Sequence, residues 1–256
     1  MTKTDHIDTP TLVRDLRPAG IAGWAATVLL FSGVITMSSG GAPEPNFDAP
    51  VAEMQRYLET RPPTALAVGS YLLVFGLCAL LWFVCGLAGA LRRPGAGPTW
   101  LPTVVVASGT AAVAAFLPGA IQASGFRGAV DGLDVQLAQY AFDLNSITLA
   151  NAWVAFGSLS LASGWAILAG RGQPGSPERP GWPAWLGWWA LAVGAGFVVA
   201  RVVWTTPVWL IPYLPFWVWV LVVSTRMLRA LPVRRRQWSV AEHGGPGGHG
   251  RRPVRA

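Results

Sequence analysis

Six long apolar stretches divide this chain, and each is long enough to cross a membrane as a helix. A transmembrane helix needs about 20 consecutive, mostly apolar residues. The stretches are residues 20–37, 64–91, 101–121, 144–170, 185–204 and 208–228. The first five hold no Asp, Glu, Lys or Arg in their central part, where a charge in hydrocarbon is costly. The sequence therefore predicts a polytopic membrane protein with six spans.

The spans are predicted to be helices rather than strands of a β-barrel. Barrel strands alternate apolar and polar residues over about ten positions, whereas these runs are continuously apolar. Only 12% of the residues are charged, about half of the roughly 25% that is usual in soluble domains. We therefore expect an all-α, polytopic transmembrane bundle of six helices over residues 20–230. It is flanked by a cytoplasmic N-terminal tail, 1–19, and a disordered basic cytoplasmic tail, 231–256.

The basic residues indicate which side of the membrane each loop faces, because Lys and Arg concentrate in cytoplasmic loops. Fifteen of them lie in the N-terminal tail, in the loops after the second and fourth spans, and from Arg226 to the C-terminus, against three in the remaining loops and Arg201 at the end of the fifth span. Acidic residues on the sparse side are Glu44, Asp48, Glu53, Glu59, Asp131, Asp134 and Asp143. We therefore expect both termini in the cytoplasm. The net charge of +7 is explained by the basic residues of the cytoplasmic loops and tails. No nucleic-acid partner is therefore expected.

The first stretch has an alternative interpretation as a cleaved signal peptide. The segment Met37–Ala42 resembles a small-residue signal-peptidase site. The region before the stretch is long and acidic for a signal peptide, however, and Pro43 would directly follow the cut. We therefore expect a retained helix, and a mature protein that starts at residue 43 would contradict the six-span count.

Two segments on the acidic side are predicted to be amphipathic helices. The first begins near Asp48 and Pro50 and ends before Arg61-Pro62-Pro63, with Val51, Met54, Tyr57 and Leu58 on one face. It is expected to lie on the membrane or to cap the bundle. The second begins near Asp131 and can continue straight into the fourth span.

The chain carries no motif that indicates catalysis or a cofactor. Phosphate-loop, His-Glu-x-x-His and Cys-x-x-Cys patterns are all missing. The three histidines, His6, His243 and His249, lie in the tails, which argues against haem. Proton-coupled transporters usually keep a carboxylate in mid-membrane, and these spans have none. We expect no enzyme activity, no metal and no cofactor.

Cys78 and Cys85 stand seven residues apart in the second span. On a helix they share one face but lie roughly 10 Å apart, which is too far for a disulfide. We expect both to be small, buried apolar residues.

Candidate site residues gather at the acidic ends of the third to fifth spans. They form a candidate polar pocket of Gln122, Asp143, Asn145, Asn151 and Arg201. Arg201 lies in the last turn of its span, where it either snorkels to the interface or forms an ion pair with Asp143. The second possibility would close a polar pocket between helices.

Three further features concern helix packing and anchoring. Pro212 and Pro215 in the sixth span are candidate helix kinks, because each removes a backbone donor. Trp residues near the ends of the fifth span suit aromatic belts. Small residues spaced four apart, such as Gly164 and Gly194, suit close contact between the fourth and fifth spans.

The run Tyr71–Arg93, YLLVFGLCALLWFVCGLAGALRR, and the segment Trp182–Trp188 entering the fifth span together resemble one protein type. They are similar to uncharacterised six-span integral membrane proteins of high-GC, actinobacterial-type Gram-positive bacteria, a domain of unknown function. The resemblance covers most of residues 20–230. It implies a bacterial plasma-membrane location and brings no catalytic residues.

Three functions are compatible with these features. The first is a binding, interaction or membrane-structural protein that lies in the lipid bilayer and meets a membrane-protein partner or a second copy. The alternative is a small transporter or channel for a neutral or lipid-like solute. A lipid enzyme is the third and weakest reading. A closed, apolar bundle interior would favour the first function, and a polar-lined cavity reaching mid-membrane would favour the second.

Overall fold

The structure, a computed structural model, describes residues 16–60, 62–92, 98–129, 135–170 and 182–229. Across these residues the regular structure is entirely helical. The helices are α2 (Leu16–Ser38), α3 (Val51–Thr60), α4 (Pro63–Leu91), α5 (Leu101–Ala129), α6 (Val135–Ala169), α7 (Ala184–Val202), the 3-10 turn η1 (Pro207–Trp209) and α8 (Leu210–Arg229). Six of them are long and apolar enough to span a membrane. The predicted all-α, six-span fold is confirmed.

Several helix ends differ from the predicted ones. The first span begins at Leu16 rather than at residue 20, with Pro18 in the first turn, where proline costs no helical hydrogen bond. α5 continues past residue 121 to Ala129, and α6 begins at Val135, so the fourth span carries the predicted amphipathic segment as its first turns. The predicted tails, apart from residues 16–19, lie outside the described residues.

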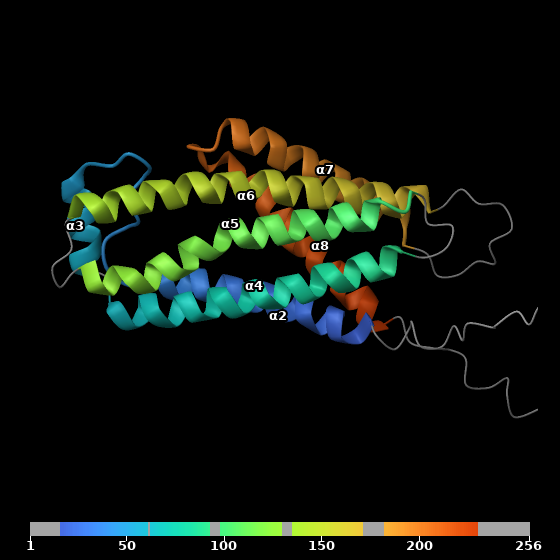
Figure 1. The fold of residues 1–256 in the computed structure, drawn as a ribbon, viewed down its shortest axis with the longest axis horizontal. Helices are drawn as coiled ribbons and strands as arrows, with labels where there is room; N and C mark the ends of the chain where they lie inside the picture. The colour runs from blue at the N-terminus through green and yellow to red at the C-terminus, as the bar shows by residue number, and fades with distance from the viewer. Residues whose placement is uncertain (1–15, 61, 93–97, 130–134, 171–181, 230–256) are drawn as a thin grey trace, which may run out of the picture.

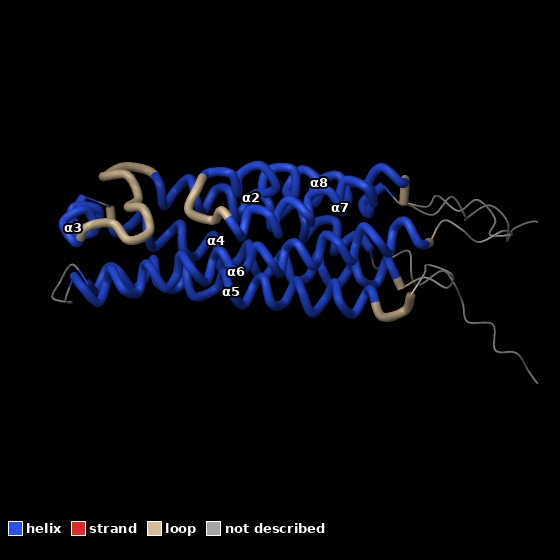
Figure 2. The backbone as a smooth tube through the Cα atoms, turned by 90° about the horizontal axis from the view of Figure 1, so that it is seen from above, coloured by secondary structure: helices blue, strands red, loops and turns tan. Residues whose placement is uncertain are grey.

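The six long helices run side by side and α3 lies across one end of them (Figures 1 and 2). Each spanning helix packs against its neighbour in the sequence, from α2 through α4, α5, α6 and α7 to α8, and α8 packs back against α2. The helices therefore form a closed ring. Two hydrogen bonds join its last member to its neighbours, from Trp24 Nε1 to Thr225 Oγ1 at 3.1 Å and from Trp219 Nε1 to the Leu186 carbonyl at 3.1 Å.

Glycines set the close approach of α6 and α7. A Cβ on Gly164 would lie 2.7 Å from the carbonyl oxygen of Gly187, and one on Gly194 would lie 2.9 Å from that of Gly157. Such distances are below van der Waals contact, so only glycine allows these backbones to meet. The two glycine pairs fix the register of α6 against α7, and this register places the candidate site.

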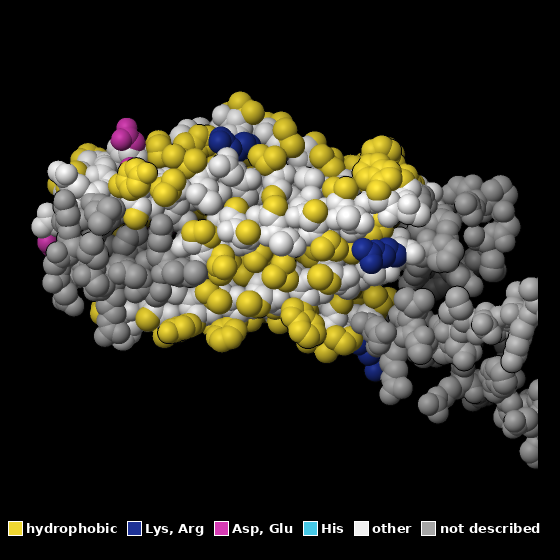
Figure 3. Space-filling model, viewed as in Figure 1, with side chains coloured by type: hydrophobic (Ala, Val, Ile, Leu, Met, Phe, Trp, Pro, Cys, Tyr) yellow, Lys and Arg dark blue, Asp and Glu magenta, His cyan; other side chains and the backbone are white. Residues whose placement is uncertain are grey.

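Apolar side chains are spread over much of the described face of the ring that Figure 3 shows. Phe75 and Trp82 of α4 are exposed, as are Trp188 of α7 and Ile211 of α8, which suits lipid contact. Cys78 and Cys85 of α4 are also exposed and free, so the prediction that they are buried was wrong. Lipid-facing positions are as apolar as interior ones, so their burial could not be read from composition.

The two ends of the ring differ in charge. We call the end that carries α3 the α3 end. The opposite end, called the basic end, holds the described arginines Arg17, Arg92, Arg226 and Arg229 at the termini of α2, α4 and α8. α6 has 35 residues and is about 52 Å long, well beyond the ~30 Å hydrocarbon layer. Because α6 ends level with its neighbours at the basic end, its excess length lies at the α3 end, and there it supports α3.

Candidate functional site

Arg201 and Asn151 form the central contact of the candidate site. Arg201 lies in the last turn of α7, where the negative end of the helix dipole stabilises a cation. Its Nε donates to Oδ1 of Asn151 on α6 at 3.0 Å. Its guanidinium carbon lies 6.0 Å from the centre of the Trp204 ring, within the range of a cation–π contact. The guanidinium of Arg201 is thus held by the Asn151 amide on α6 and by the Trp204 indole, which follows the end of α7.

Asp143 has a partner other than Arg201. Its Oδ1 accepts a hydrogen bond from the backbone N–H of Asp48 at 3.2 Å. Asp143 and Asn151 are eight residues apart on α6, which is about 12 Å along the axis. Of the two alternatives for Arg201, the ion pair with Asp143 is therefore not formed, because the α6–α7 register brings Arg201 level with Asn151, two turns away from the carboxylate.

The segment around α3 is docked on the projecting part of α6. Met54 and Tyr57 are 1% and 5% exposed, and the Tyr57 ring lies 6.4 Å from that of Phe142 on α6. Gln139 Nε2 donates to the Ala49 carbonyl at 2.6 Å. Of the two predicted placements, on the membrane or on the end of the bundle, the amphipathic helix therefore has the second. We call residues 47–60 the cap.

The cap is also joined to the turn between α7 and α8. The Phe47 ring meets the Trp204 ring edge-on at 4.7 Å between centres. The guanidinium of Arg201 lies over the Trp204 ring in turn. Asp48 has a φ of 60°, a left-handed conformation that Asp tolerates better than most residues, and it turns the chain between Phe47 and α3. The cap, the α7–α8 turn and Arg201 thus form one connected structure.

The remaining candidates lie apart from this contact. Asn145 is half-buried on α6, one and a half turns from Asn151. Gln122 belongs to α5, but its side chain lies outside the described part of the structure. Pro212 is in the first turn of α8, where no helical hydrogen bond is lost. Pro215 is inside α8 and leaves the carbonyl four residues earlier without its helical donor, so Pro215 alone keeps the predicted potential to kink.

An aromatic cluster, which the sequence alone did not reveal, lies in the ring interior, and we call it the aromatic plug. It consists of Phe116, Phe156, Phe197, Phe216 and Trp217. The Phe156 ring lies 5.0 to 6.5 Å from the other four, which come from α5, α7 and α8. Phe156, Phe197 and Phe216 are at most 1% exposed. Phenylalanines on four different spans were visible in the sequence, but only the helix register shows that they meet.

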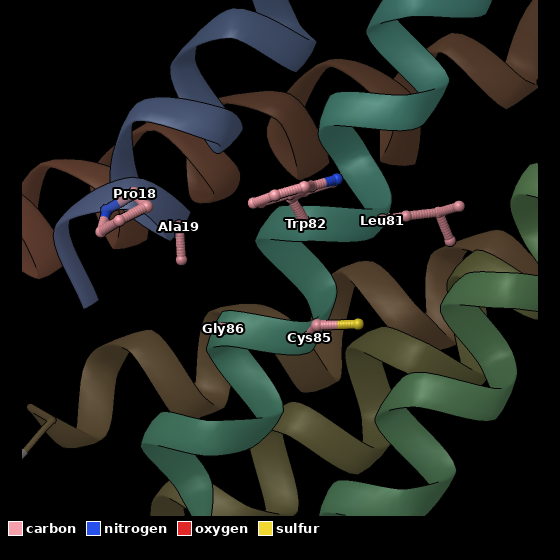
Figure 4. A pocket seen from close by; sticks show the side chains of 6 residues that line it. All are labelled: Pro18, Ala19, Leu81, Trp82, Cys85 and Gly86. Carbon is pink, nitrogen blue, oxygen red and sulfur yellow. The ribbon is translucent and has the colours of Figure 1, made fainter. Parts of the chain in front are cut away.

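A hollow of about 540 Å³ lies near the basic end, between α2 and α4. Pro18, Ala19, Leu81, Trp82, Cys85 and Gly86 line it. Figure 4 shows the Trp82 ring extending from α4 toward α2. The lining is apolar and includes none of the predicted site residues. Trp82 is 70% exposed, which places the hollow on the outer, lipid-facing side of the ring rather than in its interior.

The described side chains at this site include the guanidinium of Arg201 and the exposed polar residues on the outer face of α3. Among the described residues, no three His, Cys, Asp or Glu side chains gather to hold a metal ion. Comparison with protein-family models, with curated proteins and with solved structures finds no match to this chain.

Proposed function

We propose that this chain is a multi-pass protein of the bacterial plasma membrane with the α3 end outside and both termini in the cytoplasm. The support is the charge distribution. The described arginines of the basic end match the positive-inside pattern of the whole sequence. The α3 end carries Asp48, Glu53, Glu59 and Asp143.

Within that membrane, we propose a binding, interaction or membrane-structural role without catalysis. The observation that carries this proposal is the contrast between the interior and the cap. The aromatic plug occupies the middle of the ring with side chains from α5, α6, α7 and α8, which supports a closed interior. The cap, in contrast, is a docked helix that leaves an ordered polar face in solvent.

That exposed face supports recognition of a protein partner. Glu53, Gln55, Arg56 and Glu59 are exposed on α3, and Gln55 Nε2 donates to Glu59 Oε1 at 2.8 Å. A helix whose buried residues anchor it to the bundle presents a fixed outer surface. The conformational entropy lost when a partner binds to it is therefore small. A membrane-protein partner or a second copy of the chain is the expected occupant.

The test is site-specific photo-crosslinking in living cells. A photoreactive amino acid is placed at Glu53 or Arg56 on the cap, and at Phe75 on the lipid-facing side of α4 as the control. Adducts of discrete mass from the cap positions, and none from Phe75, are expected. Adducts from neither cap position would contradict the interaction role.

Solute flux distinguishes the alternative function. The purified chain is reconstituted in vesicles, and the entry of small neutral solutes is followed by vesicle swelling. A closed ring predicts the same rate as protein-free vesicles. Saturable entry that depends on the protein would instead support a transporter for a neutral solute.

A further inference from the structure

The Arg201 guanidinium has more donors than the described residues use. A guanidinium has five N–H donors in a planar fork. The Nε donor binds Asn151, whereas no described residue accepts a hydrogen bond from the four donors on the two Nη atoms. The free edge of a planar guanidinium matches two oxygens of a phosphate.

The position of Arg201 in the bilayer suits a phospholipid headgroup. α7 has 19 residues and is about 28 Å long, close to the ~30 Å of the hydrocarbon layer. Arg201 lies in its last turn, which is therefore the boundary where phosphates begin. Val199 and Val202 beside it are 60% and 79% exposed, so this part of α7 faces lipid rather than another helix.

We propose that Arg201 binds the phosphate of a phospholipid in the leaflet at the α3 end, with Asn151 and Trp204 as positioning residues. The amide holds Nε and the indole covers one face of the guanidinium, so the Nη edge is directed away from both. A lipid with a net negative charge, such as phosphatidylglycerol, is the expected ligand, because its phosphate is not neutralised by an amine in its own headgroup.

A second interfacial arginine provides a matched control. Arg226, in the last turn of α8 at the basic end, lies 5.7 Å from the centre of the Trp185 ring. It resembles Arg201 in charge and in its tryptophan contact, but no described residue gives it a hydrogen-bonded amide. A difference between the two arginines therefore measures positioning rather than general attraction of a cation to lipid.

The experiment is a lipid titration of the full chain in detergent micelles, followed by native mass spectrometry. The affinity for the first bound phosphatidylglycerol is compared among variants. Arg201→Gln is expected to weaken it about tenfold, as the loss of a charged hydrogen bond implies. Arg226→Gln is expected to change it by less than about twofold, since a rim charge contributes little. Equal weakening in both variants, or no weakening in Arg201→Gln, would overturn the proposal.

Two conservative variants keep the test decisive if Arg201→Gln does not fold. Asn151→Ala retains the charge but releases the guanidinium, and Arg201→Lys retains the charge without the planar fork. Both are expected to bind phosphatidylglycerol more weakly than the unmodified chain, and unchanged affinity in both would overturn the proposal.

Inorganic phosphate at millimolar concentration is the control that distinguishes a lipid phosphate from free phosphate. Displacement of the lipid by inorganic phosphate would show that the site takes free phosphate and that the lipid assignment is wrong.

Discussion

Arg201 on α7 donates from Nε to Oδ1 of Asn151 on α6 at 3.0 Å. Arg201 also lies against Trp204 of the α7–α8 turn, and Phe47 of the cap packs on the same indole. The contact with Asn151 fixes the one charged side chain of the α7 span at the membrane boundary. The glycine pairs between α6 and α7 determine that Asn151, and not Asp143, is level with it.

Asn151→Ala should destabilise the bundle modestly. Hydrogen bonds between membrane helices contribute about 0.6 kcal/mol on average and up to ~1.7 kcal/mol, and this one joins α6 to α7. Asn145→Ala is the matched control, because Asn145 lies on the same helix and forms no hydrogen bond through its side chain to a described residue. Equilibrium unfolding in mixed micelles measures both. Equal effects of the two variants would show that the Asn151 contact carries no specific stability.

Two glycines one turn apart on α4 should respond in opposite ways to alanine. A methyl group on Gly86 would overlap the Cβ of Ala19 on α2, whereas nothing lies within 4 Å of a Cβ on Gly89. Gly86→Ala should cost about 1–3 kcal/mol through overpacking. Gly89→Ala should be neutral or stabilise by up to about 1 kcal/mol through helix propensity. The same unfolding assay decides, and an undiminished stability of Gly86→Ala would contradict the close packing of α2 on α4.

Removal of the central ring of the aromatic plug should be severe. Phe156 is 1% exposed and Phe75 is 62% exposed, so the same substitution can be compared inside the ring and on its lipid face. Phe156→Ala should cost about 3–5 kcal/mol, the range for a buried phenylalanine. Phe75→Ala should cost less than about 1 kcal/mol, as at surface positions. Similar losses from both would argue that Phe156 also faces lipid.

The cap should loosen locally when its buried anchor is shortened. Met54 is 1% exposed and Val51 is 39% exposed on the same helix. Met54→Ala should weaken the docking of α3 by about 2 kcal/mol, which raises hydrogen exchange of the α3 amides about thirtyfold. Val51→Ala should leave that exchange nearly unchanged. Amides of α4 should be protected as before in both variants, and a global increase in exchange would contradict a separately docked cap.

The sequence was sufficient to predict the number of spans, their approximate limits and the amphipathic helix before the second span. These properties depend on length and polarity along one segment, and the hydrocarbon layer imposes both. It was also sufficient to single out Asn151 and Arg201, because strongly polar residues inside a span are rare.

The sequence did not predict which helix faces are buried or which side chains contact each other. In a membrane the outward face is as apolar as the inward one, so periodicity does not separate them; Cys78 and Cys85 were assigned to the wrong face for this reason. For Arg201, snorkelling and an ion pair with Asp143 both stayed open, because the sequence shows charge but not helix register. Gly157, Gly164, Gly187 and Gly194 carry the register, and pairing them across α6 and α7 would have indicated Asn151.

The most direct test of the account is which end of the ring faces outward. In a background with Cys78→Ala and Cys85→Ala, single cysteines are introduced as Glu53→Cys in the cap and Arg229→Cys at the basic end. They are labelled in intact cells with a membrane-impermeant maleimide. Glu53→Cys is expected to be labelled in intact cells, and Arg229→Cys only after the cells are opened. Labelling of Arg229→Cys in intact cells, with Glu53→Cys protected until the cells are opened, would contradict the proposed orientation.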